Sequence, residues 1–342
     1  MNANKIVALG ELLLRLQPEG HLRFLQADRL ESTFGGAEAN VCVSLAHFGE
    51  RPVFVTKLPE HEIGQAAVNS LRRYGVDVSE IRRGGNRVGI YYCEKGASQR
   101  PSKVIYDRAG SSFAESDPDE FDWETILEGA SWFHVTGITP ALSDGCAETA
   151  LRACRTAREM GIPVSTDLNY RKKLWTPEKA GRVMEELCGY VDVCIANEED
   201  AKDVFGIAAE GSDVTGGDLK RDGYAEVARK LTERFGFRAV AITLRESLSA
   251  SDNRWSGMLY TDGRPFFSKT YDVHIVDRVG GGDSFGAGLI YAMTNGYSPE
   301  KAIEFAAAAS CLKHTVEGDF NMVSLQEVLR LAAGDGSGRV QR

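Results

Sequence analysis

A glycine-rich turn leads directly into a helix in the segment Asp277-Arg278-Val279-Gly280-Gly281-Gly282-Asp283-Ser284-Phe285-Gly286-Ala287-Gly288-Leu289. Apolar residues recur at helical spacing from Phe285 to Met293, so a buried helix face begins immediately after Asp283. The consecutive glycines 280–282 leave their backbone N–H groups unobstructed, and the N-terminus of the helix adds partial positive charge. The segment therefore predicts a cradle for an anion.

The carboxylate of Asp283 stands where the turn meets the helix, and its role has two interpretations. It can cap the helix, which is common in any α/β protein. It can instead take part in a reaction, because phosphoryl transfer to an alcohol needs an anion cradle together with a group that takes up the proton. The segment alone does not decide between a helix cap and an active site.

Composition limits the partners that this chain can have. Of its 342 residues 43% are hydrophobic, which is enough for a large α/β core, and the net charge is −9 with an isoelectric point near 5.3. This acidity argues against nucleic acid or an anionic membrane surface as a partner. The cysteines form no CxxC pair, and no apolar run approaches the roughly 18 residues of a membrane span. We expect a cytoplasmic protein with reduced thiols and no membrane segment.

Strand and helix patterns alternate along most of the chain, which predicts an α/β fold with a mainly parallel sheet flanked by helices. The predicted strands are 6–9, 53–57, 132–136, 163–167, 191–196 and 239–243. The predicted helices are 37–48, 63–74, 144–160, 177–190, 224–235, 284–295 and 299–314.

Two segments break this rhythm, because residues 12–34 and 88–108 alternate apolar and polar side chains without a helix between them. Such alternation is typical of antiparallel strands, so we expect these segments to leave the core and form a small β-sheet lid. Residues 208–222 are polar and glycine-rich and predict an exposed loop. We expect one domain over residues 1–331, followed by a flexible C-terminal tail at 332–342.

A second glycine pair leads into a helix in Gly35-Gly36-Ala37-Glu38-Ala39-Asn40, where the first lid segment returns to the core. Glycines allow a ligand to approach the backbone closely, and the Asn40 amide can donate to a hydroxyl or accept from it. Taken alone, the segment is explained more simply as a loop-to-helix turn with a solvated Asn40.

Polar residues also follow three of the predicted core strands and the second lid segment, at 167–171, 196–200, 243–247 and 106–111. Ligands of open α/β sheets usually bind at the carboxyl ends of the strands. The arginines in these segments can hold a carboxylate in bidentate geometry, and the carboxylates after residue 196 can hold Mg²⁺ through water. Taken singly, each of these side chains is explained equally well as a solvated surface charge or a first-turn helix residue.

Together these segments resemble the ribokinase-like (PfkB-type) carbohydrate kinases. The Gly35-Gly36 element and the 277–289 element match the two signatures of that family in order and separation, and the resemblance extends from Gly10 to about Leu331. It implies a ribokinase-like fold, in which a βαβ core carries a β-sheet lid. It also implies ATP as the phosphoryl donor with Mg²⁺, and it allows a monovalent cation near Asp277.

By this resemblance Asp283 is the catalytic base, and the N–H groups of Gly280, Gly281 and Gly282 form the anion hole for the transferred phosphoryl group. The family signature usually reads Gly-Ala-Gly-Asp, and we expect Gly281 in place of the alanine only to loosen the turn. Asn197 and Asp200 match an Asn-x-x-Glu element that organises Mg²⁺, with Asp in place of Glu. The implied nucleotide-binding residues are Asn169, Asn197, Thr243, Arg245, Ser247, Gly280 and Gly282.

Within the family the chain looks most similar to the 2-keto-3-deoxygluconate kinases, in which tyrosines contact the sugar chain and arginines hold the C1 carboxylate. The implied substrate-binding residues are Gly35, Gly36, Ala37, Asn40, Tyr92, Tyr106, Arg108, Arg171, Asp283 and Asp319. Arg15 stands near where neutral-sugar kinases often place an acidic residue, which also favours an anionic substrate. The expected reaction is ATP-dependent phosphorylation of the C6 hydroxyl of 2-keto-3-deoxygluconate, a sugar acid of Entner–Doudoroff metabolism.

Three alternatives stay open from the sequence. A fructokinase-like enzyme also carries an Asn-x-Arg element such as 169–171. An NAD(P)-dependent oxidoreductase is disfavoured because the glycines at 280–288 do not fit GxGxxG, and a non-catalytic sugar sensor is disfavoured because Asp283 is intact. The expected partners are a sugar acid and ATP, with no nucleic acid and no membrane, and the apolar face of the lid predicts a homodimer through the lid.

Overall fold

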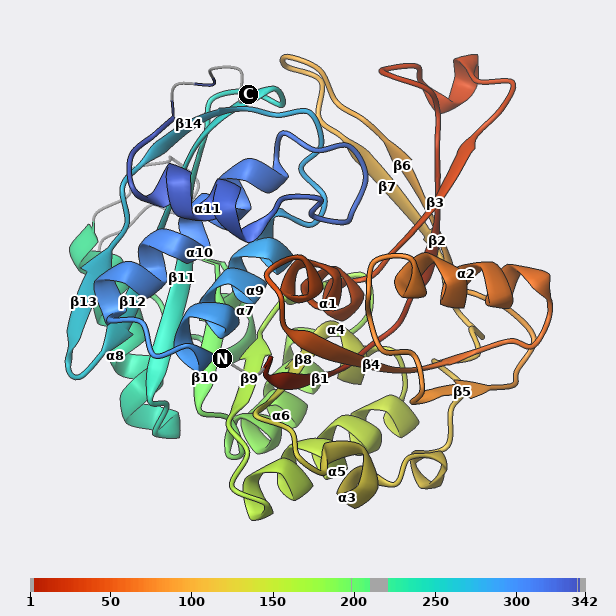
Figure 1. Cartoon of the computed structure of the whole chain (residues 1–342), viewed down its shortest axis with the longest axis horizontal. Coiled ribbons are helices and arrows are strands. Elements are labelled where there is room, and N and C mark those ends of the chain that lie inside the picture. The colour runs from red at the N-terminus through yellow and green to blue at the C-terminus, as the bar shows by residue number, and fades with distance from the viewer. Residues whose placement is uncertain (1–2, 198, 210–220, 337, 339–342) are drawn as a thin grey trace.

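A mainly parallel sheet runs through the middle of the molecule (Figure 1). The computed structural model describes residues 3–197, 199–209, 221–336 and 338. Over these residues the sheet has ten strands in the order β13-β12-β11-β10-β9-β8-β1-β4-β5, with β14 paired to β12. Their bounds are β1 (Lys5–Leu9), β4 (Arg51–Leu58), β5 (Ile81–Arg83), β8 (Trp132–Thr136), β9 (Val164–Asp167), β10 (Val193–Ala196), β11 (Ala239–Ser247), β12 (Asp252–Thr261), β13 (Arg264–Phe267) and β14 (Tyr271–His274).

Neighbouring strands from β5 to β11 are parallel, whereas β12 pairs antiparallel with β11, β13 and β14. The parallel strands need apolar side chains on both faces, because helices cover both. In β1, for example, Ile6 packs into the core on one face and Val7 into the core on the other.

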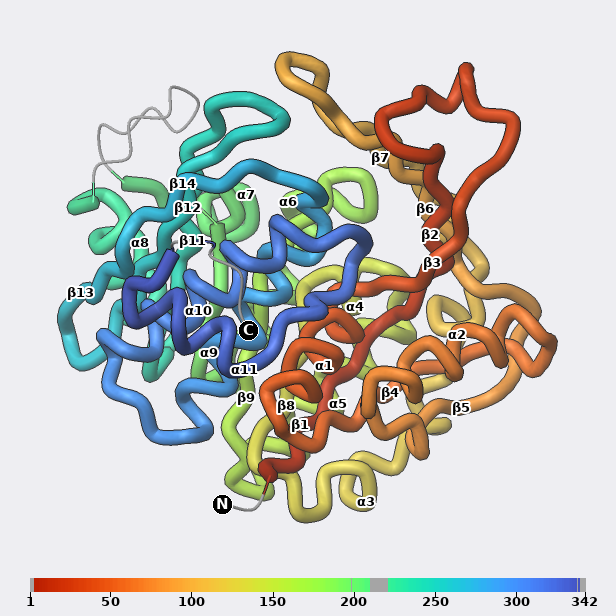
Figure 2. Tube along the Cα trace, turned by 45° about the horizontal axis from the view of Figure 1, so that its top comes forward, coloured from red at the N-terminus to blue at the C-terminus, as the bar shows by residue number. Residues whose placement is uncertain are grey.

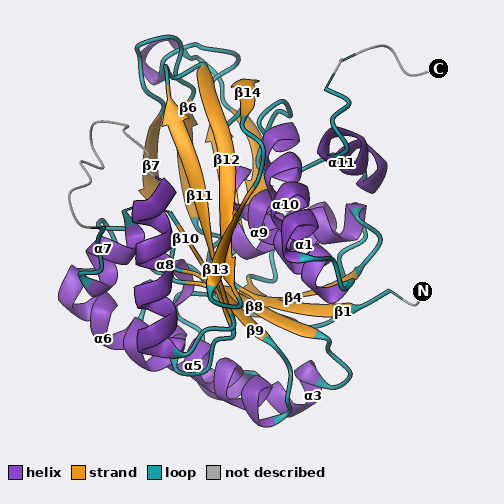
Figure 3. Cartoon of the chain, turned by 90° about the vertical axis from the view of Figure 1, so that its left-hand side faces the viewer, coloured by secondary structure: helices purple, strands orange, loops and turns teal. Residues whose placement is uncertain are grey.

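Helices lie on both sides of this sheet (Figure 3). One face carries α1 (Ala37–His47), α9 (Gly281–Thr294), α10 (Pro299–Lys313) and α11 (Leu325–Ala332). The other face carries α3 (Trp123–Leu127), α5 (Asp144–Glu159), α6 (Pro177–Cys188), α7 (Asp200–Phe205) and α8 (Arg221–Phe235). The helix α2 (Glu62–Arg72) packs near β4, and the short α4 (Ile138–Ala141) follows β8. The first turn of α9 and the start of α1 thereby meet at the same edge of the sheet.

A second, smaller sheet stands apart from the core (Figure 2). It has the strand order β3-β2-β6-β7, with β2 (Leu13–Gln17), β3 (Glu31–Gly35), β6 (Ile90–Glu94) and β7 (Lys103–Asp107). Each predicted lid segment forms one antiparallel pair, and β2 and β6 join the two pairs in parallel. The predicted lid is therefore present, although the sheet is not antiparallel throughout.

The prediction of a mainly parallel sheet flanked by helices is confirmed, and each predicted core strand and helix has a counterpart within a few residues. The prediction missed the antiparallel strands β12, β13 and β14, and it ended β11 four residues early, at Thr243. The pattern of β12 is interrupted by Gly257, where a Cβ would lie 2.6 Å from the Phe285 ring. Because α9 packs closely on β12 at this point, only a glycine fits there. The same glycine interrupts the apolar pattern, so the sequence did not predict the strand.

Two predictions fall partly outside the described residues. The loop predicted at 208–222 covers 210–220, which the structure does not describe, and α8 already begins at Arg221. The tail predicted from 332 includes 337 and 339–342, which are not described either. The seven cysteines are buried and unpaired. In the part of the chain that is described, no helix is long and apolar enough to cross a membrane.

Candidate active site

A cavity of about 390 Å³ lies between the lid and the carboxyl ends of the parallel strands. The lid contributes residues of β2, β6 and β7. The core contributes residues at or after the ends of β9 and β10, residues in the second half of β11, and the first turns of α1 and α9. This is the edge of an open α/β sheet at which ligands bind. The cavity therefore brings together segments that the sequence could only suggest one by one.

The glycine turn before α9 is held in a conformation that only glycine adopts readily. Gly280 is the N-cap residue with φ of 85°, and a Cβ there would lie 2.2 Å from the Asp319 carbonyl oxygen. The helix begins at Gly281, so the N–H groups of Gly282 and Asp283 have no acceptor within the helix, whereas the Gly281 N–H donates to the Arg278 carbonyl oxygen at 3.3 Å. Gly280, Gly281 and Gly282 all line the cavity, so the turn lies where the sequence predicts an anion cradle.

Gly281 has a different role from the one that its sequence context suggests. A Cβ at Gly281 would lie 2.6 Å from Cε1 of His314, so the histidine ring fills the space that an alanine methyl would occupy. The ring is fixed because its Nδ1 lies 2.7 Å from the Ser310 carbonyl oxygen and its centroid lies 4.9 Å from that of Trp255. The expectation that glycine here only loosens the turn is wrong, because the turn is closely packed.

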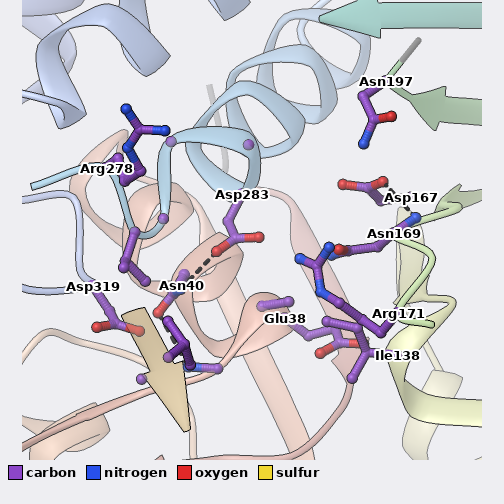
Figure 4. Close-up of a pocket in the computed structure, with 18 of the residues that line it drawn as sticks. Glu38, Asn40, Ile138, Asp167, Asn169, Arg171, Asn197, Arg278, Asp283 and Asp319 are labelled. Atoms are coloured by element: carbon purple, nitrogen blue, oxygen red, sulfur yellow. Dashed lines mark hydrogen bonds between the residues drawn. The ribbon is translucent and has the colours of Figure 1, made fainter. Parts of the chain in front are cut away.

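Asp283 points into the cavity from the first turn of α9 (Figure 4). Asn40 on α1 donates a hydrogen bond from Nδ2 to Asp283 Oδ2 at 2.7 Å, and its Oδ1 accepts from the Gly36 N–H at 3.3 Å. Burial raises the pKa of Asp283 to about 6, against the opposing effects of the Asn40 hydrogen bond and the charge of Arg171. The carboxylate is thus oriented, yet basic enough to accept a proton near neutral pH.

A second acidic group lies across the cavity from Asp283, where Asp167 ends β9 and lines the cavity (Figure 4). Burial, with the charges of Asp200 and Asp283, raises the pKa of Asp167 well above its ordinary value. Asp200 lies behind this surface and does not line the cavity, and burial raises its pKa to about 6. Asn197 lines the cavity, and its Oδ1 accepts hydrogen bonds from the backbone N–H groups of Glu199 and Asp200 at the start of α7.

The two arginines predicted to bind a carboxylate both line the cavity, but they differ in their partners. Arg108 is 8% exposed and donates from Nε to Glu11 Oε2 at 2.8 Å, with a second bond from Nη2 to the same oxygen. Arg171 donates only to the Tyr170 carbonyl, at 3.4 Å, and forms no ion pair within the described residues. Figure 4 places the Arg171 guanidinium between Asp283 and Asp167. Arg171 is therefore the arginine whose charge an anionic ligand can neutralise.

The lid presents Tyr91 and not Tyr92 to the cavity. The strand register pairs Arg15 with Tyr91 and Tyr91 with Tyr106, which places these three side chains on the inner face of the lid. Tyr92 pairs with Ile105 on the outer face and contacts the Phe24 ring. The prediction that Tyr92 lies in the site is wrong, because neighbouring residues of a strand point to opposite faces and Tyr91, not Tyr92, lines the cavity.

Arg15 does not reach the cavity. Its side chain is fully buried and forms ion pairs with Asp277 at 2.6 Å and Asp319 at 2.7 Å. Since two carboxylates already neutralise it, Arg15 gives no support to an anionic substrate, contrary to the expectation from its position. Asp319 lines the cavity and also accepts a hydrogen bond from the Tyr91 hydroxyl at 2.5 Å.

A cationic region lies at the end of the cavity formed by β11 and the turn before α9. Thr243, Arg245 and Arg278 line it, whereas Ser247 at the end of β11 does not. Arg278 was not predicted as a site residue. Burial lowers the pKa of Arg278, and the positive charge of Arg245 lowers it further. Two arginines that repel each other, with no ion pair in the described chain, favour an anion as ligand.

Most of the predicted site residues thus meet in one cavity, and the exceptions are Tyr92, Asp200 and Ser247. The predicted residues that line it are Gly35, Gly36, Ala37, Asn40, Tyr106, Arg108, Asn169, Arg171, Asn197, Thr243, Arg245, Gly280, Gly281, Gly282, Asp283 and Asp319. The lining residues that were not predicted include Glu11, Glu38, Tyr91, Asp167, Trp255, Arg278 and His314. Several of them stand beside predicted residues in the sequence, so the segments were recognised although the individual side chains were not.

A model of the pfkB family of carbohydrate kinases matches residues 3–324. This chain belongs to that family. A crystal structure of 2-dehydro-3-deoxygluconokinase from Thermotoga maritima is 52% identical, with a TM-score of 0.94 over 97% of this chain and 100% of that chain. The fold of this pfkB kinase is therefore ribokinase-like, as predicted, and an oxidoreductase is excluded.

Curated relatives of this pfkB kinase act on closely related sugar acids. The 2-dehydro-3-deoxygalactonokinase of Haloferax volcanii is 35% identical over 98% of each chain. The 2-dehydro-3-deoxygluconokinase of Thermoproteus tenax is 30% identical over 92% of this chain and 89% of its own length. The two relatives differ in the sugar-acid epimer that their names give, and both names belong to keto-deoxy acid kinases.

Proposed function

We propose that this kinase transfers the γ-phosphoryl group of ATP to the C6 hydroxyl of 2-keto-3-deoxygluconate and forms 2-keto-3-deoxy-6-phosphogluconate. The observation that carries the proposal is the Asp283 carboxylate, which Asn40 holds in the cavity at the first turn of a glycine-capped helix. The names of the relatives support a keto-deoxy sugar acid as the acceptor.

Asp283 acts as the general base in this mechanism. With a pKa of about 6 it is ionised at neutral pH, and it accepts the proton of the C6 hydroxyl as that oxygen attacks phosphorus. The N–H groups of Gly280 to Gly282, which lie at a helix N-terminus, stabilise the negative charge of the transferred phosphoryl group, although the Gly281 N–H also donates to the Arg278 carbonyl oxygen at 3.3 Å. The lid excludes water, which would otherwise accept the phosphoryl group in place of the sugar.

The nucleotide lies at the core end of the cavity, where Arg245 and Arg278 face its phosphates and Asn169 and Thr243 line the wall. The residues present also fit Mg²⁺, because Asp167 and Asn197 line the cavity with Asp200 behind them, and carboxylate and amide oxygens are suitable ligands for this ion. Bound Mg²⁺ would neutralise phosphate charge during transfer. Within the described residues, no three His, Cys, Asp or Glu side chains are grouped so that they could hold a metal ion.

The sugar acid lies between the lid and the core, with its C1 carboxylate on Arg171 of the core and Arg108 of the lid. Tyr91 and Tyr106 contact the carbon chain from the lid, and the backbone at Gly35, Gly36 and Ala37, together with Asp319, binds hydroxyls. Because Arg108 is already paired with Glu11, Arg171 supplies most of the attraction for the carboxylate.

An ADP-release assay tests the proposal and its rivals together. The acceptors are 2-keto-3-deoxygluconate, its galactonate epimer, fructose and ribose, each with ATP and Mg²⁺. We expect a kcat/KM at least tenfold higher for the keto-deoxy acids than for fructose. A preference for fructose would indicate the fructokinase-like alternative, and no ADP release with any sugar would indicate a non-catalytic sensor. The ratio between the two epimers decides which sugar acid is the better substrate.

We also propose that two copies associate through their lids. The outer face of the lid carries Leu16, Tyr92 and Ile105 at paired register positions, and Ile105 is 44% exposed. In solution, an Ile105→Lys variant should have half the mass of the unchanged chain by light scattering. A monomeric unchanged chain would contradict this assembly without affecting the proposed reaction.

A further inference from the structure

A cluster of buried charged side chains lies directly behind the catalytic turn. Arg15 and Lys313 are fully buried, and Asp277 and Asp319 are only 3% and 4% exposed. Arg15 on β2 binds both carboxylates, and the Tyr91 hydroxyl on β6 binds Asp319. Two cations thus face two carboxylates, so the cluster is formally neutral. It joins the lid to the loop that ends in Gly280.

Lys313 is the unusual member of this cluster, because a buried lysine is normally paired with a carboxylate. Within the described residues it forms no ion pair, and its Nζ donates instead to the backbone carbonyl oxygens of Val316 at 3.1 Å and Asp277 at 3.4 Å. Burial lowers the pKa of Lys313, and the charges of Asp277 and Asp319 oppose that effect. The ammonium group is therefore held where two carbonyl dipoles and two nearby anions attract it.

The cluster fixes the turn from several sides. The Asp277 carboxylate accepts hydrogen bonds from the N–H groups of Val279 at 3.1 Å and Gly318 at 3.2 Å. At Gly280 a Cβ would lie 2.2 Å from the Asp319 carbonyl oxygen and 3.1 Å from Lys313 Cε. The back of the turn thus rests on Asp319 and Lys313, while its front presents N–H groups to the cavity. A shift of Lys313 or Asp277 would move those N–H groups.

We propose that Lys313 and Arg15 are positioning residues, fixed internal cations that hold the Asp277–Gly280 turn in the geometry of the anion hole. Lys313 supplies the charge next to the turn, and Arg15 ties the turn to the lid strand β2. Because the cluster is neutral as it stands, turnover requires no added monovalent cation near Asp277. This inference rests on the proposed phosphoryl transfer.

The test is a Lys313→Met variant, which removes the charge and keeps most of the side-chain volume. We expect kcat for 2-keto-3-deoxygluconate to fall at least 30-fold while the KM of the sugar changes less than threefold, because the anion hole acts on the transferred group. Lys301→Met is the matched control, since Lys301 is exposed on the same helix α10, and it should keep the kcat of the unchanged chain.

A Lys313→Ala variant separates charge from packing. Added ethylammonium should restore at least a tenth of the lost kcat in a saturable way, whereas ethanol, which has a similar size and no charge, should not. Equal effects of the two additives, or a Lys313→Met variant with unchanged kcat, would overturn the positioning role.

The unchanged chain gives a further readout that needs no variant to fold. Its turnover at constant ionic strength should differ less than twofold between K⁺, Na⁺ and tetramethylammonium salts, and activation by K⁺ of tenfold or more would contradict the inference. If the unchanged chain phosphorylates none of the sugars, the proposed function fails first. If the unchanged chain is active and the Lys313→Met variant keeps its kcat, only the positioning role is contradicted.

Discussion

The lid end and the core end of the cavity differ in how their charges are balanced. At the lid end, Arg108 faces Glu11 and Arg15 faces two buried carboxylates, so the positive charges are neutralised within the protein. At the core end, Arg171, Arg245 and Arg278 form no ion pairs in the described part of the chain. The charges at the lid end are thus balanced without a ligand. The core end presents positive charges that suit the phosphates and the carboxylate of the proposed substrates.

Asp283 stands between these two ends, and its loss is the largest effect that we expect. An Asp283→Asn variant should lose about 10²- to 10⁴-fold in kcat, because a general base contributes that much, while the KM of the sugar changes little. Steady-state ADP release measures both constants. Asp144→Asn on the surface is the control, since that carboxylate only pairs with Lys179. Near-normal turnover of Asp283→Asn would remove the proposed mechanism.

The difference between the two ends is tested most directly by their arginines. An Arg171→Gln variant should raise the KM of the keto acid about 10- to 100-fold and that of fructose much less, because a hydrogen bond to a charged group contributes ~1.5–3 kcal/mol. A double variant, Arg108→Gln with Glu11→Gln, removes a neutral pair and should raise the same KM less than tenfold. Equal effects of the two changes on the KM of the keto acid would show that Arg108 attracts the carboxylate as strongly as Arg171 does.

The pH dependence of kcat/KM reports the base in the free enzyme. Because burial raises the pKa of Asp283 to about 6, the base is protonated over a wider pH range than an ordinary aspartate. We expect kcat/KM to be constant above pH 7 and to fall tenfold per pH unit below about 6. Arg171→Gln should move this fall in kcat/KM, the acid limb of the profile, to higher pH, since the charge of Arg171 lowers the pKa of Asp283.

Glu38 provides the control for this profile, because burial also raises its pKa, to about 7. The side chain is buried and accepts hydrogen bonds from Thr136 and Thr139, so Glu38→Gln keeps these bonds through its remaining oxygen. The acid limb should persist in Glu38→Gln. A limb that disappears in this variant would assign the titration to Glu38 and not to Asp283.

At the core end, Arg245→Gln should raise the KM of ATP about tenfold and leave the KM of the sugar within twofold. The reason is that Arg245 lines the part of the cavity where we propose that the nucleotide binds, and it has no carboxylate partner in the described residues. Initial rates at varied ATP and varied sugar separate the two constants. A larger effect on the KM of the sugar than on the KM of ATP would indicate that the nucleotide binds elsewhere. It would also weaken the contrast between the two ends of the cavity.

The smallest effect concerns the two lid tyrosines. Tyr91→Phe removes a hydrogen bond to the buried Asp319 carboxylate and should lower the free energy of unfolding by about 1.5–3 kcal/mol. Tyr92→Phe on the outer face should change it by less than about 0.5 kcal/mol. Denaturant unfolding of both variants measures the difference. A larger loss for Tyr92→Phe would contradict the strand register that separates their faces.

The core of the fold could be predicted from the sequence because buried parallel strands and amphipathic helices have distinct apolar patterns. The antiparallel strands β12–β14 could not, since Gly257 and several polar residues interrupt their pattern. The glycine turns and Asp283 were predicted because their chemistry is local. Tyr92 was chosen in place of Tyr91 because the alternation of a strand does not reveal which face meets the ligand.

The ion-pair partners of buried charged residues could not be predicted from the sequence for another reason. Arg15 pairs with residues 262 and 304 positions away in the chain, so neither ion pair leaves a local pattern. Without those partners Arg15 suggested an anionic substrate, whereas in the structure it is neutralised. Similarly, Arg108 could be predicted as a site residue, but its pairing with Glu11 required the fold.

Gly281 and His314 show that two distant positions can be constrained as one. Alanine at 281 alone would collide with the fixed imidazole ring, and a small residue at 314 alone would leave a void behind the anion hole. The two positions are therefore coupled, and alanine fits at 281 only if the side chain at 314 becomes smaller at the same time.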